Sequence, residues 1–278
     1  MKSFMKKNEK IVKNVLMAFV IVAVALQLPS CKKKTEADVT AIVVGTGQKY
    51  EPYCYLDANG NLVGFEKAVL DEVDKRLPQY AFTYEMFDFP SVLISLGSGK
   101  VDIGAHEFEE NPDRRKTYLY GEEGYNDYNG YIAVLENGPY ANVTSIEDFA
   151  GKPDVVLGVA AGSNYEAFVK TYNKNHPDKP LAFKVYGDDE VRIHDITNGK
   201  TAGTILIRDD VTKYNALQNA GLISKGEPVI VSKAYFIFNK NNPTLQQAVD
   251  GALRTMKADG TLDRIHKEKL TDYYASLK

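Results

Sequence analysis

Two successive alternations of β-branched runs with helical patterns constrain the fold of this chain more than any other feature. In the first, the run 39–44 precedes a stretch, 65–77, whose apolar residues recur at helical spacing, and Pro78 ends that helix. The runs 82–87 and 101–105 read as two further strands. Strands that alternate with helices in this way predict a parallel sheet flanked by helices, because parallel neighbours need a crossover connection.

A second unit of the same kind follows in the chain. It begins at Ser145 and Asp148, which have the spacing of a capping box around a short helix. The predicted strand 155–159 then leads through the turn 162–164 into a helix over 165–173. Further strands are expected at 183–186 and 204–207, with helices at about 189–197 and 210–219.

Two β-rich segments, 131–135 and 228–231, are expected to cross between these units, and the run 234–239 returns as a strand. The tail, with predicted helices at 245–256 and 262–270, packs back on the first unit. We therefore expect an α/β fold of two lobes, each a mostly parallel sheet flanked by helices, joined by two crossing hinge strands. The expected division is lobe 1, residues 39–131 plus 232–278, and lobe 2, residues 132–231 with the hinge strands.

The first thirty residues predict a signal peptide for export rather than part of the fold. Lysines precede an apolar run, 15–28, that is shorter than the roughly 20 residues of a transmembrane helix. Ser30-Cys31 follows directly and resembles a bacterial lipobox, in which Cys31 becomes the acylated N-terminus of a lipoprotein. Ordinary cleavage beside an incidental cysteine is the alternative. Residues 31–38 would be a tether, and the protein would face the periplasm or the cell exterior.

Charge and cysteine content exclude several classes of function. The whole chain carries a net charge of −3, and its first thirty residues hold five lysines and one glutamate, so the remaining 248 residues carry −7. This argues against nucleic acid or an anionic membrane surface as the partner. Cys54 has no partner if Cys31 is acylated, and a half-buried structural thiol is its simplest interpretation. The sequence contains no phosphate loop, metalloprotease motif or nucleophile elbow, so no catalytic residue, metal or cofactor is predicted.

Short motifs follow one another through both predicted lobes, at residues 44–46, 50–53, 60–66, 96–102, 111–116, 145–148, 151–152, 158–159, 162–163 and 257–262. In this order they resemble the polar amino-acid-binding proteins of bacterial ABC importers, over nearly all of the chain after the tether. The resemblance implies a monomer that captures an amino acid or a close derivative between its lobes. It also implies delivery to a transporter permease, without chemistry and without a cofactor.

The resemblance places Arg114 at the carboxylate of the ligand. A guanidinium suits this role because it can donate two parallel hydrogen bonds to a carboxylate. A solvated charge in the run 113–116 is the alternative. Ser163 and Asn164 lie at a predicted helix N-terminus, where backbone N–H groups and the helix dipole attract an anion, although a plain strand-to-helix turn would have the same sequence.

Other positions are matched to the remaining parts of an amino acid. Tyr50 and Phe89 align with rings that stack on the ligand, and Phe89 as a core residue is the alternative. Asp209 is favoured as the acceptor for the ligand ammonium, with Asp210 as the alternative, and either would also serve as a helix cap.

The segment 105–110 departs from the family pattern, which has small and hydroxyl residues there. Glu107 and Glu109 lie two apart on an extended segment, so we expect both to point to one side. They would favour an extra positive group on the ligand or pair with Arg114. A similar acidic segment occurs in cystine-binding-like members, which favours a sulfur amino acid. The rival interpretation is a periplasmic cyclohexadienyl or prephenate dehydratase-like enzyme that uses His106 with these carboxyls as acid and base.

Cys31→Ser is expected to release the protein from membranes, because acylation needs the cysteine sulfur and the two chains of a lipid anchor hold a protein stably. Membrane fractionation and labelling with a radioactive fatty acid check this. Cys54→Ser is the matched control and should leave membrane association unchanged. Continued fatty-acid labelling of the Cys31 variant would contradict the anchor.

Overall fold

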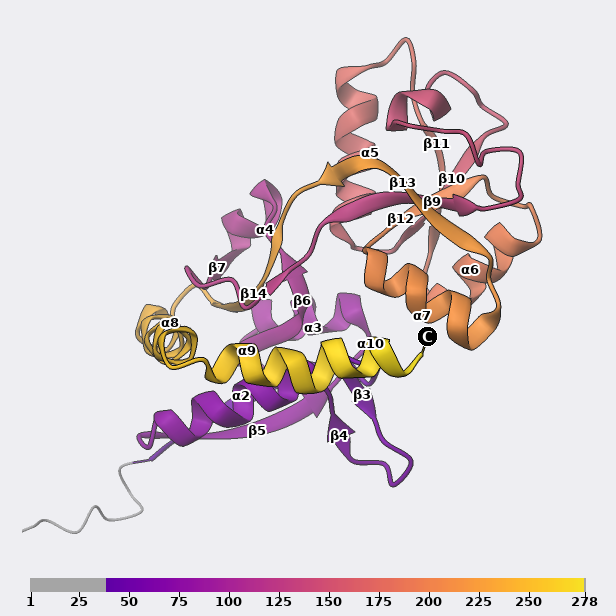
Figure 1. Cartoon of the computed structure of the whole chain (residues 1–278). Helices are drawn as coiled ribbons and strands as arrows, with labels where there is room; N and C mark the ends of the chain where they lie inside the picture. Colours follow the sequence, from indigo (N-terminus) through magenta and orange to yellow (C-terminus); the bar gives the residue numbers. More distant parts are fainter. Residues whose placement is uncertain (1–38, 278) are drawn as a thin grey trace, which may run out of the picture. The chain divides into compact units, whose positions relative to one another are not determined.

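Two large sheets flanked by helices form most of the described part of the computed structural model, residues 39–277 (Figure 1). The predicted signal peptide, Cys31 and the tether lie outside the described residues. Within residues 39–277, no helix is both long enough and apolar enough to cross a membrane. The predicted mixed α/β class, with helices against sheets, is confirmed.

The first sheet has the strand order β5-β1-β6-β14-β7, and β8 also pairs with β14. Its strand β1 is parallel to both β5 and β6, as the strand–helix–strand order predicted, whereas β14 enters antiparallel between β6 and β7. The alternation along β1 buries Ile42 and Val44. The bounds are β1 (Thr40–Thr46), β5 (Tyr80–Met86), β6 (Ile103–Glu109), β7 (Tyr118–Tyr120), β8 (Asn126–Asp127), β14 (Lys233–Asn239), α2 (Phe65–Arg76), α3 (Phe89–Gly97) and α4 (Pro112–Thr117).

The second sheet has the order β11-β10-β12-β9-β13. Its strands β10, β11 and β12 are parallel, and β9 and β13 close one side antiparallel. Ser145 is the N-cap of the short helix η2, and its N–H donates to the Asp148 carboxylate as the predicted capping box requires. The bounds are β9 (Gly130–Leu135), β10 (Val156–Ala160), β11 (Ala182–Tyr186), β12 (Gly203–Leu206), β13 (Leu222–Ile230), η2 (Ile146–Phe149), α5 (Asn164–Asn175), α6 (Asp189–Thr197) and α7 (Arg208–Gln218).

Two short segments connect the sheets. One runs from β8 to β9 through residues 127–130, and the other from β13 to β14 through residues 230–233. The Ser232 N–H donates to the Asn129 side chain at 3.1 Å, so the two crossing segments are hydrogen-bonded to each other. Movement of one sheet relative to the other would therefore bend both segments together.

A small third sheet, β2 (Lys49–Tyr50), β3 (Cys54–Leu56) and β4 (Leu62–Val63), follows β1. The loop between β3 and β4 is the predicted hairpin turn. Its Asp57 carboxylate accepts N–H groups of Asn59 and Asn61, and Gly60 has φ 79°, a conformation that glycine adopts without strain.

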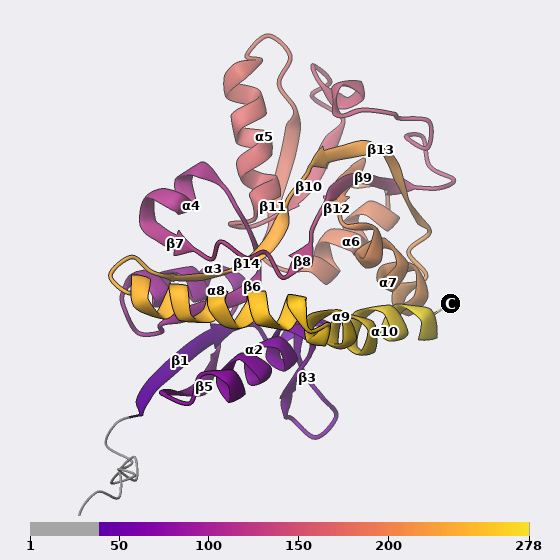
Figure 2. The same ribbon diagram turned by 60° about the vertical axis from the view of Figure 1, so that its left-hand side comes forward.

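The C-terminal helices are α8 (Pro243–Ala258), α9 (Thr261–His266), a π-helical turn (Lys267–Thr271) and α10 (Asp272–Ser276). The prediction of one regular helix over 262–270 was wrong, because the π turn interrupts it. Helices α8 and α9 contact α2, beside which they lie in Figure 2. In contrast, α10 contacts α7 of the second sheet, and its Tyr274 hydroxyl bonds that of Tyr53 at 3.3 Å.

Asp250 on α8 is a charged residue within the first sheet's core, with 1% of its surface exposed. Its carboxylate accepts the backbone N–H groups of Glu122 at 3.1 Å and Glu123 at 3.2 Å, and it also bonds the Gln246 amide. These bonds fix the loop after β7 on α8. They also satisfy a buried carboxylate that would otherwise destabilise the fold.

Asp250→Ala is expected to lower the free energy of unfolding by about 2–4 kcal/mol, because it leaves two backbone donors and one amide without their acceptor. Urea denaturation followed by circular dichroism measures this. Asp263→Ala, at an exposed position on α9, is the control and should change stability by less than about 0.5 kcal/mol. Equal stability of both variants would contradict a structural role for Asp250.

Candidate ligand-binding site

The predicted site residues lie where strands of the two sheets end. Tyr50 follows β1 and Arg114 follows β6, while Asn164 follows β10 and Asp210 follows β12. In open α/β sheets, ligands bind beyond the carboxyl ends of parallel strands. Hydrogen bonds connect residues from the two sheets here, so the structure brings most of the predicted positions together.

Arg114 is buried, with 7% of its surface exposed, although it lies in a charged run. Asn111 caps α4 by accepting the Arg114 N–H at 2.8 Å. The guanidinium donates to the carbonyl of Gly162 in the second lobe at 2.7 Å and to that of Glu109 at 3.2 Å. It also lies over the ring of Phe89, 5.5 Å from the centroid. A solvated surface charge does not fit this environment.

Glu109 is buried beside Arg114, with 5% of its surface exposed. Burial raises the pKa of its carboxyl to about 8, although the charge of Arg114 and a hydrogen bond to Asn164 lower it. Among residues 39–277 its Oε1 has no hydrogen-bond partner. Glu109 is therefore a carboxyl with an unused acceptor that lies between residues of the two lobes.

Glu107 is also buried, but the strand around it is irregular. Its φ is 47°, which is rare for a residue other than glycine, and the pairing of β6 with β14 shifts register nearby. Residues 103–109 form the strand β6, but the positive φ of Glu107 breaks the two-residue alternation on which the expected common direction of Glu107 and Glu109 depends. The Glu107 N–H donates to Glu66 at 2.8 Å, and its Oε2 accepts from Asn126 at 2.8 Å. Burial is the main reason that the pKa of Glu107 is raised well above its ordinary value, and the charge of Glu66 raises it further.

Asp210, rather than Asp209, faces the first lobe. Asp210 has 4% of its surface exposed, and it accepts the Tyr50 hydroxyl at 2.9 Å and the Lys213 ammonium at 2.9 Å. Asp209 is exposed. The alternative that the sequence left open therefore fits an ammonium site better. Lys213 also donates to the carbonyl of Glu51 at 3.1 Å, so this cluster joins the two lobes.

Aromatic rings cover the space between these charged groups. Tyr50 stacks on His106 at 5.6 Å between centroids, and Phe89 meets the edge of the same histidine at 4.9 Å. Tyr50 and Phe89 are both partly buried, as a stacking role requires. Burial lowers the pKa of His106 to about 4, so its ring is neutral near pH 7. This neutral ring belongs to the wall of the site.

The side chains of Ser163 and Glu166 form hydrogen bonds with backbone groups at the N-terminus of α5. The Ser163 hydroxyl caps the helix by accepting the Glu166 N–H at 3.1 Å, and it donates to the Ala160 carbonyl at 2.7 Å. The Glu166 carboxylate accepts the Gly162 N–H at 2.6 Å. Part of the anion site predicted at this turn is thus taken by a side chain of the protein. Asn164, which is buried and bonds Glu109, is the predicted residue of this turn that faces the first lobe.

Several residues of this region were missed from the sequence. Lys213 lies three residues after Asp210 on α7, and this i, i+3 spacing was a usable signal. No sequence pattern distinguishes Tyr128 or Tyr165 from the other tyrosines, of which the chain has 18 in all. Both are buried, and the hydroxyl of Tyr128 bonds that of Tyr50.

The thiol of Cys54 is buried next to this wall, with 1% of its surface exposed. A β-carbon placed on Gly47 would lie 3.0 Å from the Cys54 sulfur and 2.4 Å from the His106 Nε2, so Gly47 separates the two side chains and leaves no room for a larger residue. Burial raises the pKa of the thiol well above its ordinary value.

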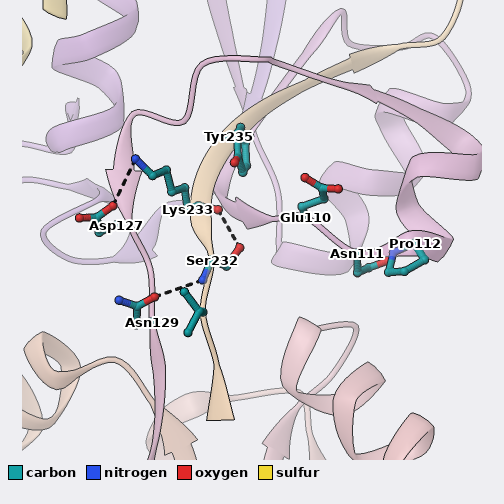
Figure 3. Close-up of a pocket in the computed structure, with 9 residues that line it drawn as sticks. Glu110, Asn111, Pro112, Asp127, Asn129, Ser232, Lys233 and Tyr235 are labelled. Carbon is teal, nitrogen blue, oxygen red and sulfur yellow. Dashed lines mark hydrogen bonds and ion pairs between the residues drawn. The ribbon is translucent and has the colours of Figure 1, made fainter. Parts of the chain in front are cut away.

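A surface pocket of about 470 Å³ lies beside the crossing segments, apart from this cluster. Figure 3 shows Asp127 facing Lys233, whose ammonium is 3.6 Å from its carboxylate, and Asn129 bonded to Ser232. None of the predicted ligand residues lines the pocket. The pocket is lined by Glu110, Asn111, Pro112, Asp127, Asn129, Val231, Ser232, Lys233 and Tyr235.

In the Glu109→Gln variant, the free energy of unfolding is expected to fall less than in the unchanged protein as the pH rises from about 6.5 to about 8. Because the Glu109 pKa is about 8 in the folded protein and ordinarily 4.5, the folded state holds a proton that the unfolded chain releases, and stability falls as pH rises by at most about 1.4 kcal/mol per unit. His106, with its pKa lowered to about 4, has the opposite effect only below its ordinary value of 6.5. Glu107 has the same sign as Glu109, so part of the slope remains.

Urea titrations at the two ends of this pH range measure the slope. Glu110→Gln is the matched control, because that neighbour is exposed and its ion pair with Arg115 lowers its pKa. A slope that is equal in the Glu109 variant and the unchanged protein would show that Glu109 is already ionised at neutral pH.

Comparison with known proteins bears on the fold and the family of this chain. The sequence profile of bacterial extracellular solute-binding proteins, family 3, matches residues 42–271. The L-cystine-binding protein TcyK of Bacillus subtilis (strain 168) is 34% identical over 239 residues, which cover 85% of this chain and 86% of that protein. The L-cystine-binding protein TcyJ of the same strain is 31% identical over 87% of this chain and 89% of its own length.

Among solved structures, a putative L-cystine ABC transporter protein from Listeria monocytogenes superposes with a TM-score of 0.74 and 31% identity, covering 84% of this chain and 96% of that one. The two-lobed fold and the family resemblance inferred from the sequence are thereby confirmed. The chain belongs to the bacterial extracellular solute-binding proteins of family 3.

Proposed function

We propose that this protein captures an amino acid or a close derivative between its lobes and delivers it to the permease of an ABC-type importer. The observation that carries this proposal is the pair of opposite charges at the lobe boundary. Arg114 of the first lobe reaches the Gly162 carbonyl of the second, and Asp210 of the second lobe reaches Tyr50 of the first. An amino acid carries one carboxylate and one ammonium, which these two groups match.

The arrangement supports one binding mode. The ligand carboxylate pairs with Arg114 and the ammonium with Asp210, while Tyr50 and Phe89 enclose the carbon skeleton. The Lys213 ammonium, held 2.9 Å from Asp210, supports this assignment, because the carboxylate already accepts such a donor. Because the contacts come from both lobes, ligand binding favours the closed arrangement, which is the form that a permease would recognise.

Within the amino acids, we propose L-cystine or a related sulfur compound as the ligand class. The two curated relatives above are named as L-cystine-binding proteins at 34% and 31% identity. Glu107 and Glu109 also make the crevice acid-rich, and each has a buried oxygen without a partner among residues 39–277. A ligand ammonium lowers the pKa of a nearby carboxyl, so both side chains can ionise against a ligand with more than one ammonium group.

The cellular setting completes the proposal. Residues 1–30 direct export, Cys31 carries the lipid, and residues 31–38 tether a monomer to the membrane. Lobe 1 comprises residues 39–131 and 232–278, and lobe 2 residues 132–231. An anchored protein remains near the permease, which raises its local concentration there. The protein acts by binding and release, without a chemical step.

Arg114→Ala is expected to weaken ligand binding by about 100-fold or more, because a buried charge partner is removed from the ligand carboxylate. A thermal-shift screen against the common amino acids, cystine and prephenate identifies the ligand, and calorimetry then measures its affinity. Arg115→Ala is the matched control, since the neighbouring arginine is exposed and paired with Glu110.

Unchanged affinity in the Arg114 variant, with a native circular dichroism spectrum, would contradict the assignment of Arg114 to the ligand carboxylate. Consumption of prephenate by the unchanged protein would replace the binding function with the dehydratase-like one. Stabilisation by one class of amino acid, without turnover, is the expected result.

A further inference from the structure

Lys213 on α7 is a buried cation that joins the two lobes. It has 6% of its surface exposed. Its ammonium donates to the Asp210 carboxylate of its own lobe at 2.9 Å and to the Glu51 carbonyl of the first lobe at 3.1 Å. The same ammonium lies over the ring of Tyr50, 4.8 Å from the centroid. Lys213 thus contacts both the carboxylate and the aromatic ring that the proposed function assigns to the ligand.

A structural ion pair is the simpler explanation of Asp210 and Lys213, because i, i+3 pairs are common on helices. Such pairs are normally exposed and stabilise a helix only slightly. Here the side chain of Asp210 is 6% exposed and that of Lys213 is 8% exposed. Arg192, another buried cation of this lobe, bonds Asp189 and Thr204, which both belong to the second lobe. Lys213 differs from it because its ammonium also bonds the first lobe.

Both oxygens of the Asp210 carboxylate have partners within the protein. Its Oδ1 accepts the Lys213 ammonium, and its Oδ2 accepts the Tyr50 hydroxyl. The carboxylate is buried, so water screens a second cation beside it only weakly. One carboxylate balances one ammonium, and a buried charge without a counter-ion is costly. The ammonium of a ligand and that of Lys213 would therefore compete for Asp210.

A lysine side chain suits a contact that has to be given up. Its four-carbon stem is flexible, and its ammonium is strongly hydrated in water. When the ammonium leaves a carboxylate, it can turn toward solvent while the stem remains on the protein. An arginine would hold a carboxylate more firmly, because its planar guanidinium can donate two parallel hydrogen bonds. The residue type at position 213 thus fits an exchangeable partner of Asp210.

We propose that Lys213 is an internal competitor of the ligand. Its ammonium holds Asp210 and the Glu51 carbonyl, and an amino acid binds by displacing it with its own ammonium. Lys213 thereby lowers the affinity for amino acids, and its return to Asp210 favours release of the ligand. It also keeps a buried carboxylate compensated between two ligands. This inference rests on the proposed function and adds a residue that regulates binding and release at the same site.

Calorimetry with a matched pair of probes tests the competition. L-Cystine and dithiodipropionate share the disulfide and both carboxylates, but dithiodipropionate lacks the ammonium groups. Lys213→Met should raise the affinity for L-cystine, relative to that for dithiodipropionate, by about 10-fold or more, because binding no longer breaks a charge-assisted contact. Lys213→Arg should leave this ratio of affinities as low as in the unchanged protein. If the thermal-shift screen identifies another amino acid, that amino acid and its des-amino acid replace the pair.

Two further variants keep the result interpretable. Lys200→Met is the matched control, because this lysine of the same lobe is exposed and pairs with Asp195 at 3.0 Å. It should leave the ratio unchanged. Where methionine at the buried position prevents folding, Lys213→Gln takes its place, since the amide keeps a donor for Asp210 without the charge. It should raise the ratio in the same direction, and circular dichroism checks the fold of each variant.

The possible outcomes separate the two proposals. Equal changes in affinity for both probes in Lys213→Met would show that Lys213 acts on lobe closure or on a ligand carboxylate. That result would overturn the competition and leave the proposed function standing. A lower ratio in Lys213→Met would do the same, because both ammonium groups would then bind together. Binding of no amino acid by either the unchanged protein or Lys213→Met would overturn the proposed function, and the competition with it.

Discussion

The guanidinium of Arg114 donates to two backbone carbonyls, one from each lobe, while shielded from water. A buried cation needs compensation, and the surrounding structure supplies it through these carbonyls and the rings of Phe89 and Phe108. The start of α4 helps to position the arginine, because Asn111 caps the helix by accepting the backbone N–H of Arg114 three residues later. The carboxyl edge of the first sheet is thus organised around one charge.

The second lobe holds a buried group of the opposite charge, which also needs polar partners. Asp210 is buried and held by Tyr50 and Lys213, and Lys213 continues to a backbone carbonyl of the first lobe. Part of the boundary between the lobes therefore consists of polar groups that are hydrogen-bonded in pairs, beside a core cluster of apolar residues that has members in both lobes. Polar contacts of this kind can be exchanged for those of a polar ligand at little net change in free energy. An apolar contact would have to be broken and exposed to water.

The sequence predicted those elements that depend on local patterns. The helices at 65–77 and 189–197 agree with α2 and α6 within one residue, because periodicity and end signals coincide there. The π turn after His266 carries no such signal. The sequence could not decide between Asp209 and Asp210 for a geometric reason, since a shift of one residue on a helix rotates a side chain by about 100°. The positive φ of Glu107 and the burial of Arg192 arise from tertiary contacts, which no local pattern records.

The buried thiol of Cys54 bears on whether a disulfide ligand stays chemically intact, rather than on how a ligand is recognised. Thiolates, and not thiols, attack disulfides, and burial keeps the Cys54 sulfur in the thiol form. A disulfide compound that entered the crevice would thus meet a cysteine across Gly47 without forming a mixed disulfide with it. The cargo would leave with its oxidation state unchanged, and the protein would return to its starting form without any reductant.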